Sequence, residues 1–167
     1  IVDAEWREFD LDADQPVWTI PRAKMKVSTH GVDHRIPLSP EIHAELVAWK
    51  RIHGEGKYLF PSPSKNKYIS REAIEKAYRV TLELGRKHSP HGWRSAFSTL
   101  ARDNGFERDA VEISLDHAHD NDVALSYDRG KRFDQRVELM RWWGRQLAAA
   151  ERGGEVIPLT RNKDLVA

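Results

Sequence analysis

Four side chains in the middle of the chain, His91, Arg94, His117 and Tyr127, have types and spacing suited to handling a phosphate. His91 and Arg94 lie one helical turn apart, so both side chains project from one face of a helix. Pro90 fixes the start of that helix, where backbone N–H groups already favour an anion. A phenol with a pKa of about 10 attacks phosphorus only if cations stabilise the phenolate and the transition state. These residues indicate a basic pocket for one phosphate, with a phenol as the attacking group.

Each of these residues also has a purely structural interpretation. A histidine that caps a helix and an arginine in a surface ion pair are, for His91 and Arg94 alone, the more common case. A tyrosine placed like Tyr127, between Ser126 and Asp128, is more often a half-buried anchor than a nucleophile. Residue types alone therefore do not decide between a pocket and ordinary structure.

A metal site is a further alternative. His117, His119 and Asp120 form a His-x-His-Asp pattern known in metallohydrolases, and His88 and His91 could supply more ligands. In such enzymes the pattern commonly follows a strand, whereas here a helical pattern precedes it. No further cluster completes a ligand shell with convincing spacing, so the sequence favours no metal.

The bulk composition describes an ordinary globular domain. The chain has 167 residues, 40% hydrophobic and 32% charged, with a net charge of +1 and no cysteine. This length suits one domain, and the lack of cysteine excludes disulfides and cysteine-based zinc sites. We find no signal peptide and no apolar run near the roughly 20 residues of a membrane span, which predicts a cytoplasmic protein without a membrane partner. A near-neutral charge restricts any DNA contact to a local basic cleft.

Hydrophobic periodicity and turn residues predict a mainly α fold with a small antiparallel β-sheet near the N-terminus. A strand or turn is expected over 6–14, and strands over 17–21 and 34–38 flank a cationic hairpin. Helices are expected over 39–54, 70–85, 89–104, 107–115, 120–127 and 132–151. Most of the six tryptophans fall on apolar stripes. Trp93 is predicted to face inward, and Trp142, which lies off its stripe, is a candidate partner contact.

His91-Gly92-Trp93-Arg94, Leu115-Asp116-His117 and Tyr127, in this order, resemble the catalytic domain of tyrosine recombinases, the phage-type integrases. Further stretches resemble the integrases of satellite prophages and genomic islands. These are Glu5–Asp12, Trp18–Pro21, Met25-Lys26, His34–Ser39 and Ala124–Arg129. The resemblance covers Ile1 to about Ala150 and implies the fold of DNA breaking-rejoining enzymes.

The resemblance also implies a role for each matching residue. Tyr127 would attack the scissile phosphodiester to give a 3′-phosphotyrosyl enzyme and a free 5′-hydroxyl. Arg94 would clamp the nonbridging oxygens, His91 would act as an acid/base and phosphate ligand, and His117 would stabilise the transition state. Lys26 would protonate the 5′-oxygen, with Lys24 as the rival for that position. No metal or other cofactor is implied.

The expected partner is double-stranded DNA at attachment sites, bound by a homotetramer. Lys24, Arg22 and Arg129 are the candidate DNA-binding residues. A noncatalytic DNA-binding or assembly module with the same fold is the alternative function.

Two departures from the family pattern affect these expectations. The first catalytic arginine of the family would precede Ile1, so we expect residues 1–151 to be a truncated catalytic domain, folded but nearly inactive alone. Residues 152–167 would be a C-terminal tail, either disordered or docked on a neighbouring protomer. Asp116 stands where the family has a small residue.

Overall fold

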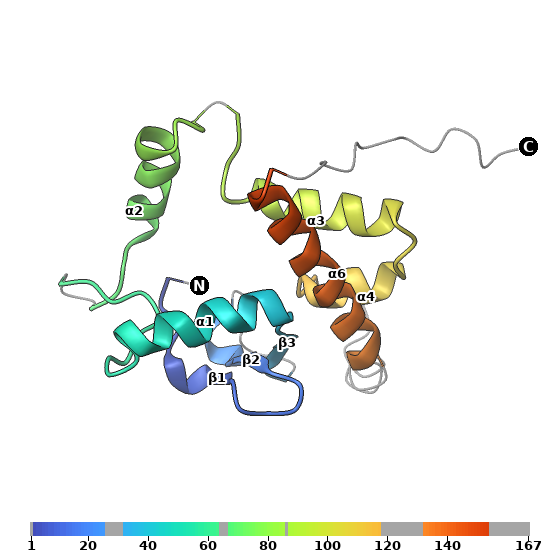
Figure 1. Cartoon of the computed structure of the whole chain (residues 1–167), viewed down its shortest axis with the longest axis horizontal. Coiled ribbons are helices and arrows are strands. Elements are labelled where there is room, and N and C mark those ends of the chain that lie inside the picture. The colour runs from blue at the N-terminus through green and yellow to red at the C-terminus, as the bar shows by residue number, and fades with distance from the viewer. Residues whose placement is uncertain (1, 26–31, 64–66, 86, 118–131, 154–167) are drawn as a thin grey trace, which may run out of the picture.

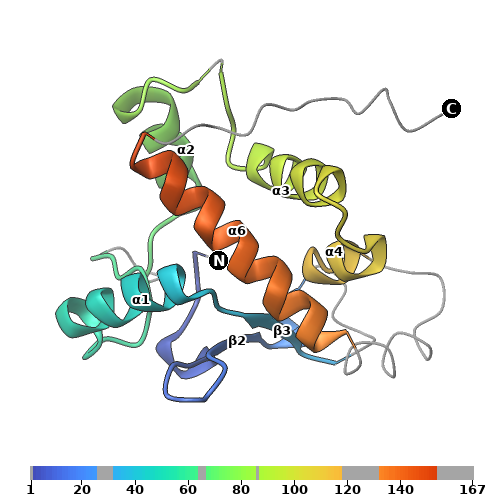
Figure 2. The same ribbon diagram turned by 45° about the vertical axis from the view of Figure 1, so that its right-hand side comes forward.

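The long helix α6 (Phe133–Glu151) packs against elements from both halves of the chain, namely α1, β3, α3 and α4 (Figure 1). The computed structural model describes residues 2–25, 32–63, 67–85, 87–117 and 132–153. Figure 2 shows α6 between the sheet with α1 on one side and two shorter helices, α3 and α4, on the other. The fold is mainly helical with a small antiparallel sheet near the N-terminus, as the sequence predicts.

The sheet has three antiparallel strands in the order β1-β2-β3. They are β1 (Phe9–Asp10), β2 (Val17–Ile20) and β3 (His34–Pro37). The β-branched and aromatic residues of β2 favour an extended strand, and Pro21 ends it. Phe9 lies opposite Trp18, and their rings stack at 5.2 Å. The segment predicted as a strand or turn over 6–14 contains both a 3-10 helix, η1 (Trp6–Glu8), and β1.

Helix α1 (Pro40–His53) covers the sheet and completes the first core. Ser39 caps it, because its hydroxyl accepts a 3.3 Å hydrogen bond from the Ile42 N–H. The buried apolar residues of this core come from the N-terminal segment, the end of β3 and the chain after α1. They are Ala4, Trp6, Leu11, Leu38 and Leu59.

The second core joins three helices, α3 (Gly92–Asp103), α4 (Arg108–Ser114) and α6. Its buried residues are Phe97, Ala101, Val111, Leu115 and Leu139. Trp142 is partly buried against this core, with its ring 5.1 Å from that of Phe106. Packing within the chain therefore accounts for part of its surface, and a partner contact at Trp142 stays a prediction.

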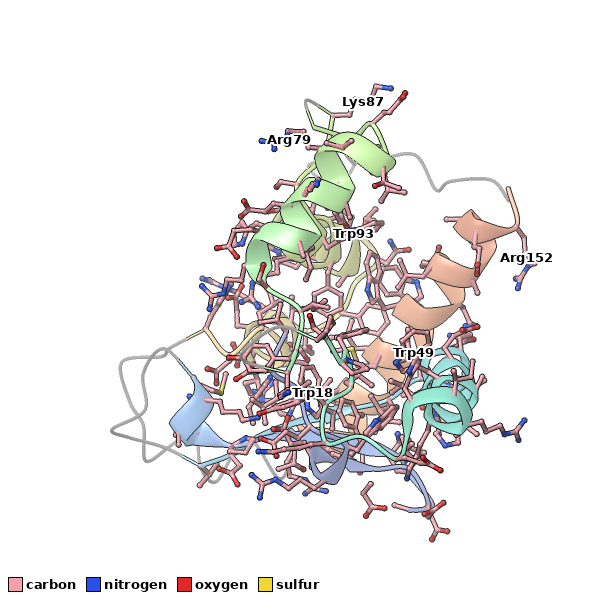
Figure 3. The ribbon with its side chains drawn as sticks, turned by 90° about the vertical axis from the view of Figure 1, so that its left-hand side faces the viewer. Trp18, Trp49, Arg79, Lys87, Trp93 and Arg152 are labelled. Carbon is pink, nitrogen blue, oxygen red and sulfur yellow. The ribbon has the colours of Figure 1, made fainter. Side chains whose placement is uncertain are left out.

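The helix predicted over 70–85 is irregular and lies at the surface of the protein. It consists of α2 (Arg71–Lys76) followed by a π-helical turn, η3 (Ala77–Thr81), and neither contains a buried residue. Trp93 is 46% exposed, which corrects its predicted inward orientation. Its indole N–H donates to the Tyr78 hydroxyl and its ring meets His88 edge-on at 4.8 Å. Figure 3 shows Trp93 beside the green helix formed by α2 and η3. The η3 turn and the chain after it, rather than the core, therefore cover the first turn of α3.

Helices α1 and α6 cross at Gly144, which is buried. A Cβ at this position would lie 2.6 Å from the Ser39 Cβ and 2.5 Å from a Glu41 carboxylate oxygen. Because Ser39 is only 3% exposed, it has little room to move. Glycine at position 144 therefore sets the distance between the two helices.

Replacing Gly144 by alanine is expected to lower the free energy of unfolding by about 1–2 kcal/mol, as overpacking outweighs the better helix propensity of alanine. Urea unfolding measures the change. A Ser39→Gly background removes the facing Cβ and hydroxyl, and there Gly144→Ala is expected to cost less, because only the longer Glu41 side chain must still move. A Gly144→Ala variant as stable as the wild type would contradict this packing.

None of the helices among the described residues is long and apolar enough to cross a membrane.

Candidate active site

Helix α3 carries Arg94 in its first turn. The Gly92 N–H donates to the Ser89 hydroxyl at 3.2 Å, which closes the turn before this helix, and His91 is the residue at its N-cap. The Arg94 guanidinium reaches across and donates through Nη2 to the Leu115 carbonyl. This bond places the arginine beside the turn that leads to His117.

The turn after α4 needs a left-handed residue, and Asp116 supplies it with a φ of +51°. Aspartate tolerates this conformation better than most residues with a Cβ, although glycine adopts it most easily. The turn closes with hydrogen bonds from the Asp116 N–H to the Ile113 carbonyl and from the His117 N–H to the Glu112 carbonyl, both at 3.1 Å. This geometry gives a physical reason for the small residue expected at position 116.

The side chain of Glu112 orients the His117 ring. Its Nδ1 pairs with a Glu112 carboxylate oxygen, and its ring remains about half exposed. The hydrogen bond from His117 holds the pKa of Glu112 below its usual 4.5, although partial burial opposes this. A carboxylate at Nδ1 leaves Nε2 as the ring nitrogen that can face a ligand.

Arg22 approaches the same turn from the N-terminal part of the chain. It belongs to a 3-10 helix, η2 (Arg22–Lys24), that directly follows β2 and Pro21. Its Nη1 and Nη2 donate to the two carboxylate oxygens of Asp116 at 3.1 and 3.0 Å, and its Nε donates to the Val32 carbonyl at 3.0 Å. Its backbone N–H donates to Asp33 at 2.9 Å. The guanidinium predicted to bind DNA thus has protein partners at all three nitrogens.

A buried polar cluster lies beneath this turn, and its residues are not among the site residues predicted from the sequence. The His34 Nε2 lies 3.3 Å from the Ser114 carbonyl, and its Nδ1 lies 3.9 Å from Asp116. Arg136 of α6, only 2% exposed, donates to the Ser114 hydroxyl at 3.2 Å and to the Arg35 carbonyl. The sequence does contain one indication that Arg136 is buried, because Arg136 lies next to Val137 and three residues after Phe133 on the inward face of α6.

Lys24 binds two buried carboxylates. Its ammonium donates to the Asp3 carbonyl at 2.8 Å, to Glu5 at 3.2 Å and to Glu8, while the Trp18 indole donates to Glu8 at 3.0 Å. Burial alone would lower the pKa of Lys24, but the hydrogen bonds and charges of Glu8 and Glu5 raise it above its usual 10.5. Burial would likewise raise the pKa of Glu5, but chiefly the hydrogen bond and charge of Lys24 lower it below 4.5.

Replacing Lys24 by methionine is expected to lower the free energy of unfolding at pH 7 by about 3 kcal/mol, because buried Glu8 loses the ammonium that it binds and buried Glu5 loses its hydrogen-bonded cation. Glu5 keeps Arg7 and Lys57, whose side chains are both largely exposed. The lowered pKa of Glu5 gives stability that is complete above pH 4.5 and lost as the pH falls through the folded-state pKa. Between pH 5 and pH 3 the variant should therefore lose less stability than the wild type. Urea unfolding at several pH values measures both effects, with exposed Lys76→Met as the control. Equal acid sensitivity of the two proteins would contradict the assignment.

The remaining predicted residues divide into two groups. His91 precedes α3 with an exposed side chain, and its carbonyl accepts a 3.0 Å hydrogen bond from the Arg94 N–H. Lys26, Tyr127 and Arg129 lie outside the described residues, as does His119 of the metal alternative. Within the described ranges, no three His, Asp or Glu side chains are grouped to hold a metal ion.

The mainly helical fold with a small N-terminal antiparallel sheet agrees with the fold expected of a phage integrase catalytic domain. Residues 1–131 match the model of the phage integrase family. The chain belongs to this family and is a tyrosine recombinase of the prophage integrase kind.

Known integrases resemble the chain along most of its length. It is 34% identical over 156 residues to prophage integrase IntA of Escherichia coli (strain K12), covering 93% of this chain and 36% of that protein. It is 38% identical over 142 residues to prophage integrase IntS of the same strain, covering 83% and 35%. The integrase of Shigella phage Sf6 is 27% identical over 143 residues, again covering 83% and 35%. The chain thus spans about a third of the length of these relatives. No solved structure gave a significant match.

Proposed function

We propose that this chain is the catalytic part of an enzyme that integrates or excises a mobile element by cutting and rejoining double-stranded DNA at attachment sites. The observation that carries the proposal is the hydrogen bond from Arg94 to the Leu115 carbonyl. It brings the arginine of the His-x-x-Arg motif beside the turn that ends in His117. A guanidinium fork and a histidine side by side are suited to the nonbridging oxygens of one phosphodiester.

In the proposed reaction the Tyr127 oxygen attacks phosphorus, a new O–P bond forms, and the bond to the 5′-oxygen breaks. His91 is the candidate to accept the phenol proton, and Lys26 donates a proton to the leaving 5′-oxygen. Arg94 and His117 stabilise the charge that develops on the nonbridging oxygens. Because the phosphotyrosyl bond preserves the energy of the phosphodiester, a 5′-hydroxyl of another strand reverses the step without ATP.

The contacts of Lys24 with Glu5 and Glu8 favour Lys26 as the proton donor, since the Lys24 ammonium is already held by three acceptors. Arg129 remains a candidate contact to the DNA backbone. We further propose that residues 1–151 form the catalytic domain, that 152–167 form a tail, and that the enzyme acts as a homotetramer on paired DNA sites.

The proposal is tested with the longest natural form of the protein that carries this chain. The substrate is an attachment-site duplex with a nick a few nucleotides 3′ of the scissile phosphate, so that the released oligonucleotide diffuses away. In EDTA, an adduct stable to denaturing detergent and a released strand with a free 5′-hydroxyl are expected. Binding without an adduct would instead support a noncatalytic module. Cleavage that requires a divalent metal would support a hydrolase.

A further inference from the structure

The pair formed by Arg22 and Asp116 joins segments 94 residues apart. Arg22 follows β2, at the start of the connection to β3, and Asp116 lies in the turn between Leu115 and His117. The side chains of the pair are only 11% and 19% exposed. A two-bond guanidinium–carboxylate contact fixes distance and orientation together, which a single contact does not.

Arg22 also closes the base of the β2–β3 connection. Its Nε binds the Val32 carbonyl and its backbone N–H binds the Asp33 carboxylate, so one residue holds both ends of the segment between them. That segment contains Lys26 in sequence, although Lys26 itself is outside the described residues. The turn that contains Asp116 is also tied to α3. Leu115, which directly precedes Asp116, accepts a hydrogen bond from Arg94 through its carbonyl.

We propose that the Arg22–Asp116 pair is a positioning device, which holds the base of the β2–β3 connection in register with the turn that carries His117. The inference rests on the proposed function, because it assigns the leaving-group proton to Lys26 in that connection. A displacement of about 1 Å can slow a positioned reaction about a hundredfold. Loss of the pair should therefore impair protonation of the 5′-oxygen more than the other parts of the reaction.

The pair also neutralises a carboxylate beside the proposed phosphate site. An unpaired Asp116 would repel the phosphate, so the test must avoid leaving that charge exposed. Asp116→Asn removes the charge while keeping the size and the tolerance for a positive φ. Arg22→Lys keeps the positive charge but cannot make two parallel bonds and the bond to Val32 at once. Both variants thus loosen the connection without adding net negative charge at the site.

The experiment compares two substrates for the longest natural form of the protein. One is the nicked attachment-site duplex, and the other has sulfur in place of the scissile 5′-oxygen, which leaves as a thiolate without needing a proton donor. Asp116→Asn and Arg22→Lys are expected to form adduct about 10- to 100-fold more slowly on the oxygen substrate. On the sulfur substrate both should be within about threefold of the wild type. Glu138→Gln, which breaks the exposed Arg141–Glu138 pair, is the matched control and should be normal on both.

Lys26→Ala supplies the second comparison. It should show the same rescue by sulfur, and Asp116→Asn should slow the oxygen reaction no further once Lys26 is absent. Equal slowing on both substrates, or no slowing on either, would overturn the positioning role. Thermal unfolding checks that each variant is folded, and Arg22→Lys remains informative if Asp116→Asn is not. A wild-type protein that forms no adduct with either substrate would instead count against the proposed function itself, and the inference would fall with it.

Discussion

A Tyr127→Phe variant is expected to form no covalent complex with attachment-site DNA, a loss of at least about a thousandfold relative to the wild type. Phenylalanine keeps the aromatic ring but lacks the oxygen that would bond to phosphorus, so the first chemical step has no nucleophile. Denaturing gel electrophoresis of a labelled nicked substrate measures the adduct.

The control for this variant is Tyr58→Phe. Tyr58 meets Tyr68 at 5.0 Å near the first core and belongs to no part of the proposed pocket. It should form adduct at the wild-type rate. Gel-shift affinity for the same DNA should be unchanged in both variants, which separates loss of chemistry from loss of binding. An adduct that persists in Tyr127→Phe would remove this tyrosine from its proposed role.

Replacing Arg94 by lysine is expected to slow adduct formation about 100- to 1000-fold, the effect of losing one donor to the transition state. Lysine keeps the charge but not the planar fork that can bind two phosphate oxygens, and it is too short and differently shaped to reproduce the bond to the Leu115 carbonyl. Single-turnover rates on the nicked substrate measure the change.

Arg102 offers a matched control on the same helix. Its guanidinium binds the Ser98 carbonyl and hydroxyl within α3, and its charge helps to lower the pKa of Glu112, an effect that lysine retains. Arg102→Lys should therefore cleave at close to the wild-type rate. A loss of less than about threefold in Arg94→Lys would show that the guanidinium is not needed at the reacting phosphate.

Local patterns predict most of the fold. Ser39, Pro40 and Glu41 predict the start of helix α1, and the structure confirms both the Ser39 cap and the first helical residue. The strand at 17–20 follows from β-branched and aromatic residues before Pro21, and the strand at 34–37 contains Ile36 and ends at Pro37. The helix cap and the strand ends depend on residues that are neighbours in the sequence, so they can be predicted from the sequence alone.

The surroundings of Trp93 and Trp142 depend on tertiary packing. A helical wheel places Trp93 in line with Phe97, but only the structure shows that η3 and the chain after it reach the first turn of α3. Trp142 lies off the main stripe of its helix, and Phe106 from the α3–α4 turn still covers it. Periodicity indicates which face is apolar and not which element will cover it.

Within the pocket, the sequence identifies Arg94 and His117 by type and spacing, and the structure adds the contacts that hold them. Arg22 and Asp116 were each singled out, one as a DNA contact and one as a departure from the family pattern, but nothing local links residues so far apart. The same holds for Lys24, whose carboxylate partners lie 16 and 19 residues earlier in the chain.

The central claim is that Tyr127 forms a bond to DNA, and peptide mapping of the adduct tests it most directly. The wild-type adduct is isolated from the nicked substrate, digested with nuclease and protease, and analysed by tandem mass spectrometry. We predict a nucleotide joined through its 3′-phosphate to Tyr127, in the peptide that follows His117. A nucleotide found on any other side chain, or joined through a 5′-phosphate, would contradict the account.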